Sequence, residues 1–149
     1  MDVPAAWQIQ TAGWRDLNEL RQIEKTCFDD DAWPLWDLVA VLTFGGIIRL
    51  KAITNGRMVG FIAGEIRSGE DVGWITTLGV LPEYRRQGIA KALMTACEEG
   101  LGTALVRLSV RRSNQTAIRL YLQNGYTQTG VWPAYYVDRE DALVLGKKR

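Results

Sequence analysis

A basic turn between an apolar run and a glycine is the segment best suited to bind an anion. It reads Leu78-Gly79-Val80-Leu81-Pro82-Glu83-Tyr84-Arg85-Arg86-Gln87-Gly88-Ile89-Ala90. We expect a helix to begin at Gly88, and a helix start leaves about four backbone N–H groups unpaired and carries roughly half a positive charge. Gly88 and the small Ala90 let an anionic group approach, while Arg85 and Arg86 add charge. The segment predicts a pyrophosphate cradle; the alternative is a basic turn that caps an ordinary helix.

Composition excludes several other chemistries. The 149 residues include no histidine, which rules out Ser-His-Asp and Cys-His catalysis. Cys27 and Cys97 are the only soft metal ligands and lie far apart in sequence, so we expect no metal and two reduced thiols in a cytoplasmic protein. The net charge of +1 gives no reason to expect nucleic acid or a membrane surface as partner. Met1–Pro4 does not resemble a signal peptide, and the apolar stretch Leu38–Ile48 is shorter than the ~20 residues of a membrane span.

Two motifs in register resemble the GNAT acetyltransferase superfamily. Arg85-Arg86-Gln87-Gly88-Ile89-Ala90 is similar to its coenzyme-A motif, Arg/Gln-x-x-Gly-x-Gly/Ala. Its second signature is similar to Val110-Arg111-Arg112-Ser113-Asn114-Gln115-Thr116-Ala117-Ile118-Arg119-Leu120-Tyr121, followed by Asn124-Gly125-Tyr126. The resemblance covers nearly the whole chain. It implies one N-acetyltransferase domain over residues 1–149 that uses acetyl-CoA as cosubstrate.

The resemblance also assigns residues to the coenzyme. It implies that acetyl-CoA is held by Leu78, Gly79, Val80, Arg85, Arg86, Gln87, Gly88, Ile89, Ala90, Asn114, Ala117 and Tyr121. The strand backbone at 78–80 would hold the thioester and the developing oxyanion. Tyr121 shares a helix face with Ala117 and Asn114 and would protonate the departing thiolate. With a thiol pKa of about 8.5 and a tyrosine pKa of about 10, no large shift is needed. The alternative is a core tyrosine.

A tyrosine pair carries the likeness toward one subgroup. Tyr135-Tyr136 precedes Glu140-Asp141-Ala142, as in protein N-terminal acetyltransferases, including the ribosomal-protein alanine type. The resemblance makes Phe28, Tyr135 and Tyr136 candidate substrate contacts; aromatic packing between two strands is the alternative for the tyrosines. It implies acetylation of the N-terminal α-amine of a protein or peptide by a monomer or homodimer. Acetylation of a small-molecule amine, and an acetyl-CoA-binding sensor with weak catalysis, are the alternatives.

The general base is where the sequence departs from its relatives. Ser109 and Trp74 occupy the positions where related enzymes carry Glu or His and Tyr, and neither side chain is a base near neutral pH. Water could relay the proton to Glu24, Glu65 or the run Asp29–Asp31; the substrate could need little help; or transfer could be slow. Neutralising lysine at pH 7 costs roughly 3.5 kcal/mol more than neutralising an α-amine, so a weak base favours the α-amine.

These residues must be positioned by an α/β (α+β) fold. Alternation and helical spacing predict strands at Trp7–Thr11, Val72–Val80, Ala104–Val110, Tyr126–Trp132 and Ala142–Leu145, and helices at Asp16–Phe28, Pro34–Leu42, Gln87–Gly100 and Gln115–Gln123. Asn55-Gly56 predicts a hairpin between Ile47–Thr54 and Arg57–Ile66, and Ser68–Asp71 a further turn. Lys147–Arg149 is expected to fray. The GNAT resemblance implies a mixed, twisted sheet of about six to seven strands, splayed near its centre, with helices on both faces.

Overall fold

The computed structural model describes residues 6–67 and 71–149. Most of the predicted turn at Ser68–Asp71, and the segment Met1–Pro4, lie outside the described residues. The helices are α1 (Leu17–Phe28), α2 (Leu35–Thr43), α3 (Ile89–Leu101) and α4 (Gln115–Gln123), with short 3-10 turns η1 (Trp14–Asp16), η2 (Asp29–Asp31) and η3 (Pro82–Tyr84). The strands are β1 (Gln8–Thr11), β2 (Ile47–Thr54), β3 (Arg57–Ile66), β4 (Val72–Val80), β5 (Leu105–Arg111), β6 (Thr127–Trp132) and β7 (Ala142–Lys148).

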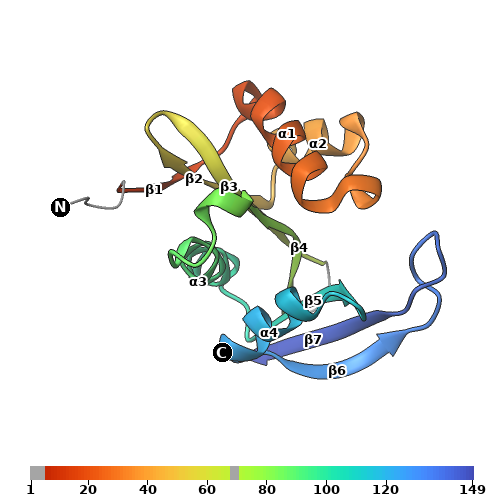
Figure 1. Ribbon diagram of the computed structural model, residues 1–149. Helices are drawn as coiled ribbons and strands as arrows, with labels where there is room; N and C mark the ends of the chain where they lie inside the picture. The colour runs from red at the N-terminus through yellow and green to blue at the C-terminus, as the bar shows by residue number, and fades with distance from the viewer. Residues whose placement is uncertain (1–5, 68–70) are drawn as a thin grey trace.

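The seven strands form one mixed sheet in the order β1-β2-β3-β4-β5-β7-β6. The pair β4–β5 is parallel and is joined through α3, while every other neighbouring pair is antiparallel. Figure 1 shows α1 and α2 on one face of the sheet and α3 and α4 on the other. The predicted mixed sheet with helices on both faces is therefore confirmed.

The predicted hairpin between β2 and β3 is also confirmed. Thr54 pairs with Arg57 across a two-residue loop, and the loop residues Asn55 and Gly56 have φ of 51° and 73°. Positive φ at both positions is what a type I′ turn requires, and asparagine and glycine tolerate it. The turn fixes the register of β3 against β2, and β3 in turn carries β4.

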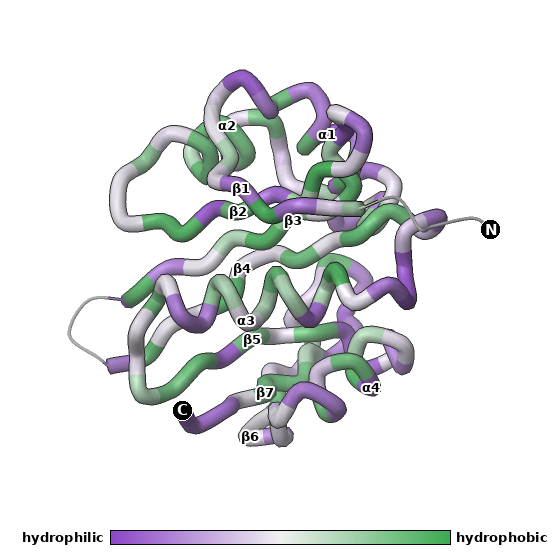
Figure 2. The backbone as a smooth tube through the Cα atoms, turned by 90° about the vertical axis from the view of Figure 1, so that its left-hand side faces the viewer, coloured by the Kyte–Doolittle hydropathy of each residue, from purple (hydrophilic) through white to green (hydrophobic). Residues whose placement is uncertain are grey.

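The core lies between the central strands and the helices. Figure 2 shows hydrophobic stretches along the central strands and on α3. α3 buries one face through Ile89, Leu93 and Cys97, and α1 buries Leu20 and Ile23 on the other side of the sheet. A Cβ at Gly60 of β3 would come within 3.2 Å of Ile89 and Leu93 side-chain atoms, so this glycine lets α3 pack closely. None of the helices within residues 6–67 and 71–149 is long and apolar enough to cross a membrane.

The C-terminal tail differs from its prediction. β7 continues to Lys148 and pairs with β5, where Lys147 lies opposite Val106 and Lys148 opposite Leu105. Lys147 Nζ forms a 3.0 Å ion pair with buried Glu98, and the Arg149 backbone N–H donates to the Ala104 carbonyl. The expectation of a frayed tail is therefore wrong, because a buried carboxylate on α3 and an unfilled edge of β5 both bind it.

Candidate active site

The sheet opens at its centre between β4 and β5. In the described part of the chain, their pairing runs from Val72–Leu105 to Trp74–Arg107 and then stops, although both strands continue. Leu78, Gly79 and Val80 pair with β3 only, so the other edge of β4 has no strand partner at these residues. Alternate residues of a strand direct their N–H and C=O groups to opposite edges, so backbone polar groups face the opening. The splay agrees with the prediction, and contact of this backbone with a thioester stays a prediction.

The predicted pyrophosphate cradle begins directly after β4. Gly88 caps the N-terminus of α3 with φ of 84°, and Arg86 has φ of 64°. A Cβ built on Gly88 would meet no atom within 4 Å, so the space in front of the first turn of α3 is open. Unpaired N–H groups and the helix dipole favour an anion there. Arg85 is turned toward the strand, since its Nε donates to the Val80 carbonyl at 2.9 Å. The geometry fits a pyrophosphate.

Gly88→Asp tests the cradle. We expect acetyl-CoA binding, measured by calorimetry, to weaken by about 100-fold, because a carboxylate would occupy the anion's place. Gly102→Asp is the matched control, since Gly102 caps the other end of α3 with φ of 65° and bears the same backbone strain. Equal affinities for the two variants would contradict a pyrophosphate site at Gly88.

α4 carries the residues that the second signature assigned to the coenzyme. Asn114 caps this helix, its Oδ1 accepting from the Ala117 N–H at 3.2 Å, so part of its role is structural. Tyr121 is 9% exposed and packs edge-to-face on Tyr126 with centroids 6.1 Å apart. Burial raises the pKa of Tyr121 to about 12. The hydroxyl therefore stays protonated well above neutral pH.

The tyrosine pair lies in the loop between β6 and β7. Tyr135 is 55% exposed, and its ring lies 5.1 Å from both Trp132 and Tyr136. Trp74 stacks on Trp132 at 5.7 Å, so aromatic rings run continuously from β4 to the loop. The structure is compatible with both substrate contact and aromatic packing. Tyr136 is half-buried against its neighbours, whereas the ring of Tyr135 is exposed to solvent. Phe28 lies half-buried at the end of α1.

The candidate bases differ sharply in their surroundings. Glu24 is 2% exposed and accepts a 3.0 Å hydrogen bond from the Thr77 hydroxyl of β4. Among the described residues its Oε2 has no hydrogen-bond partner, and it lines a hollow of about 220 Å³ with Ala32, Trp33 and Leu38. Burial raises the Glu24 pKa from 4.5 to about 7, against the smaller lowering by Thr77. A carboxylate with this pKa can take up a proton near neutral pH.

The other candidates fit less well. Asp31 is occupied by Arg111, whose Nη2 donates to Asp31 Oδ1 at 2.7 Å, so a base here would have to break an ion pair. Glu65 is half-buried on β3 and lines a different hollow with Thr76. Ser109 is half-buried on β5 opposite Val144 of β7. Within the described residues no cluster of three or more His, Cys, Asp or Glu could hold a metal ion.

One polar cluster of the site was missed by sequence reasoning. The sequence placed Arg111 in the second signature without assigning it a role. In the structure it contacts Asp31, Asp138 and Glu140. Asp31 lies 80 residues away in sequence, so no local spacing could reveal the pair. The only available signal was that an arginine ends a strand while acidic residues gather in two loops.

Comparisons with known proteins show the family of this chain. A profile of the acetyltransferase (GNAT) family matches residues 13–126. The catalytic subunit NAA10 of the N-terminal acetyltransferase A complex of Arabidopsis thaliana is 32% identical over 146 residues, covering 93% of this chain and 76% of that protein. An N-alpha-acetyltransferase of Saccharolobus solfataricus is 28% identical, covering 93% and 91%.

Solved structures share the fold as well. The crystal structure of the ribosomal-protein-S18-alanine N-acetyltransferase of Escherichia coli superposes with a TM-score of 0.85 at 26% identity, covering 96% of this chain and 94% of that one. Sequence and structure thus match over almost the entire chain. The chain belongs to the acetyltransferase (GNAT) family and is an acetyl-CoA-dependent N-acetyltransferase.

Proposed function

We propose that residues 1–149 act as one domain that acetylates the N-terminal α-amine of a protein or peptide. The observation that carries this proposal is the match over 93% of the chain to enzymes named as N-terminal or N-alpha-acetyltransferases. The position of the tyrosine pair supports the proposal, because Tyr136 packs against Arg111 at the end of β5 that has separated from β4. The half-buried Cys27 and the buried Cys97 are both free thiols, which fits a reducing cytoplasm.

Acetyl-CoA supplies the activated acetyl group, and residues of this chain would bind and orient it. The first turn of α3, from Gly88 to Ala90, would hold the pyrophosphate together with Arg86 and Gln87. Asn114 and Ala117 would flank the pantetheine arm. Backbone groups of β4 at Leu78–Val80 would place the carbonyl and stabilise negative charge on its oxygen. Tyr121 would donate its hydroxyl hydrogen to the sulfur as the C–S bond breaks.

The amine must lose a proton before or during attack. We assign the final proton acceptor to Glu24, through water, because its surroundings raise the pKa to about 7. Its hydrogen bond to Thr77 places it one residue from Leu78, where the thioester is expected. A base of this strength suits an α-amine with a pKa of about 7.7–8.0 far better than lysine at about 10.4. This argument favours N-termini over lysine side chains.

Thiol release from acetyl-CoA tests the proposed function. The panel contains short peptides with free N-termini, the same peptides with blocked N-termini and an internal lysine, and small amines such as polyamines and amino acids. We expect release with free N-termini only. Turnover of a small amine but of no peptide would overturn the acceptor assignment. Tight acetyl-CoA binding without turnover of any amine would instead identify a coenzyme-binding sensor.

A further inference from the structure

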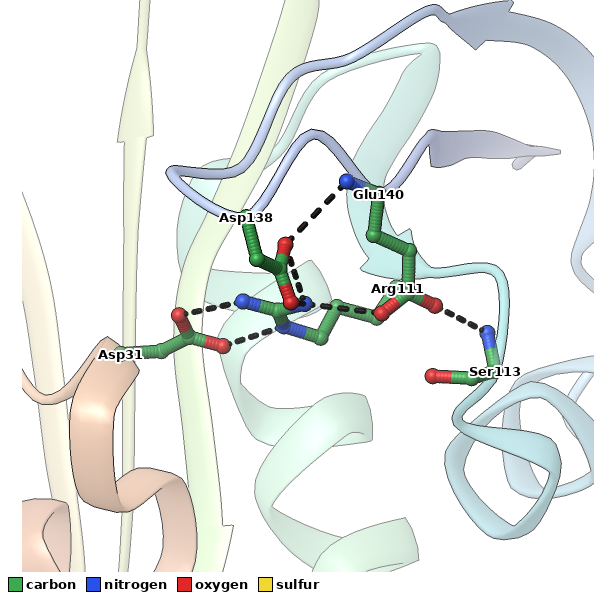
Figure 3. Close-up of polar contacts among 5 residues, drawn as sticks. All are labelled: Asp31, Arg111, Ser113, Asp138 and Glu140. Carbon is green, nitrogen blue, oxygen red and sulfur yellow. Dashed lines mark hydrogen bonds and ion pairs between the residues drawn. The ribbon is translucent and has the colours of Figure 1, made fainter.

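A four-residue ion cluster joins segments from opposite ends of the chain, and Figure 3 shows it. Arg111 presents its Nε and Nη2 to the two oxygens of Asp31 in a fork, with Nη2–Oδ1 at 2.7 Å. Its Nη1 donates to Glu140 at 2.8 Å and to Asp138 at 2.9 Å. Paired, fork-like contacts between guanidinium and carboxylate are among the strongest and most directional hydrogen bonds in proteins. The cluster therefore fixes the relative positions of the segments that carry these side chains, besides balancing part of their charge.

The position of Arg111 in the fold gives the cluster its importance. Arg111 is the last residue of β5, at the end where β5 has separated from β4. Asp31 ends η2, which follows α1, and α1 packs on β3 and β4. In the described part of the chain the sheet provides no β4–β5 backbone bond beyond Trp74–Arg107. The side chain of Arg111 thus bridges the two halves of the splayed sheet at its open end.

The same guanidinium holds the tyrosine loop. Its Cζ lies 4.1 Å from the ring centroid of Tyr136, a cation–π contact. Glu140 accepts from the Ser113 N–H at 2.7 Å, and its carbonyl accepts from the Tyr136 N–H at 3.2 Å. Arg111 therefore fixes both the side chain of Tyr136 and the backbone that carries it.

Exposure separates the strong contacts of the cluster from the weak one. The side chains of Arg111, Asp31 and Glu140 are 21%, 32% and 24% exposed, whereas Asp138 is 63% exposed. Exposed ion pairs contribute little because water screens them. Asp31 and Glu140 are thus the principal partners. Three carboxylates face one guanidinium, which leaves an excess of negative charge, and such a field favours the approach of a cationic amine.

We propose that Arg111 is a positioning residue of the acceptor site, which sets the spacing between the η2 segment and the Tyr135–Tyr136 loop. This inference rests on the proposed function, because the two segments must form the entrance through which the amine arrives. It predicts that Arg111 controls binding of the acceptor and leaves binding of acetyl-CoA untouched, since the coenzyme residues lie on β4, α3 and α4.

Steady-state kinetics of Arg111→Met, Arg111→Lys and Asp31→Asn, with the best acceptor of the wild-type enzyme, test the proposal. For Arg111→Met we expect the acceptor KM to rise by about tenfold or more while the acetyl-CoA dissociation constant is unchanged, since small misplacements at a site have large effects. Lysine should not restore the KM, because a single ammonium cannot form the fork to Asp31. Arg112→Met is the matched control: Arg112 is 61% exposed and pairs with Asp141 within the same loop region.

Two further measurements make the result decisive. Asp31→Asn should also raise the acceptor KM. The double variant Asp31→Asn/Arg111→Met should have a KM close to that of Arg111→Met alone, because both substitutions remove the Arg111–Asp31 contact. Hydrogen exchange in residues 29–33 and 134–141 should rise in Arg111→Met and not in Arg112→Met. An unchanged acceptor KM in Asp31→Asn and Arg111→Met, or an equal loss of acetyl-CoA binding, would overturn the proposal. A wild-type enzyme that prefers a small amine would instead overturn the proposed function, and the KM comparison would then be made with that amine.

Discussion

Tyr121→Phe is expected to lower kcat for acetyl transfer by about 100-fold, the size typical of a lost proton donor. The hydroxyl lies on a buried ring, and burial raises its pKa to about 12, so it is protonated throughout the working range and available to the leaving sulfur. Because the ring itself is kept, acetyl-CoA binding should weaken much less than kcat falls. Single-turnover measurement of thiol release, together with calorimetric titration of acetyl-CoA, separates the two effects.

Tyr126→Phe is the control for this experiment. Tyr126 packs against Tyr121, but its hydroxyl donates to buried Glu98 of α3 at 2.6 Å. Removing that hydroxyl should cost about 1–3 kcal/mol of unfolding free energy and leave the rate of transfer intact. Equal activity of Tyr121→Phe and the wild type would remove Tyr121 from the role of proton donor.

Glu24→Gln is expected to lower kcat by about 100-fold at neutral pH and to abolish the rise of kcat with pH. In the wild type the rate should increase as pH passes through about 7, where Glu24 ionises and can accept the proton. Glutamine keeps the size of the side chain and can still accept from the Thr77 hydroxyl. Glu65→Gln is the control, since Glu65 is half-buried on β3 and lines a different hollow, and the activity of this variant should be normal.

The same variant should change stability in a pH-dependent way. The folded-state pKa of Glu24 is raised, so the folded protein binds the proton more tightly, and unfolding free energy falls as pH rises from about 4.5 to about 7. Glu24→Gln should therefore be more stable than the wild type at pH 8, by on the order of 3 kcal/mol, and similar to it at pH 4. Urea unfolding at the two pH values measures this. A variant less stable than the wild type at pH 8, but as active, would contradict both expectations.

The secondary structure was largely predictable because its signals are local. The Asn55-Gly56 turn, the glycine that caps α3 and the apolar face of α4 each depend on residues within a few positions of one another. Strand ends that depend on a partner distant in the sequence were less predictable. β7 runs to Lys148 instead of ending near Leu145, since Glu98 and the edge of β5 hold its last residues.

The sequence by itself determined the family resemblance, the motif at Arg85–Ala90 and the lack of any histidine for catalysis. Motif spacing and composition can be seen in the sequence without knowledge of the tertiary structure. Only the tertiary structure decided which carboxylate lies buried beside β4, and so separated Glu24 from Glu65 and the Asp29–Asp31 run. It likewise brought Arg111 to Asp31 across 80 residues. Burial and long-range ion pairing are properties of packed surfaces, and the pKa of a side chain follows from its neighbours in space, which sequence order does not reveal.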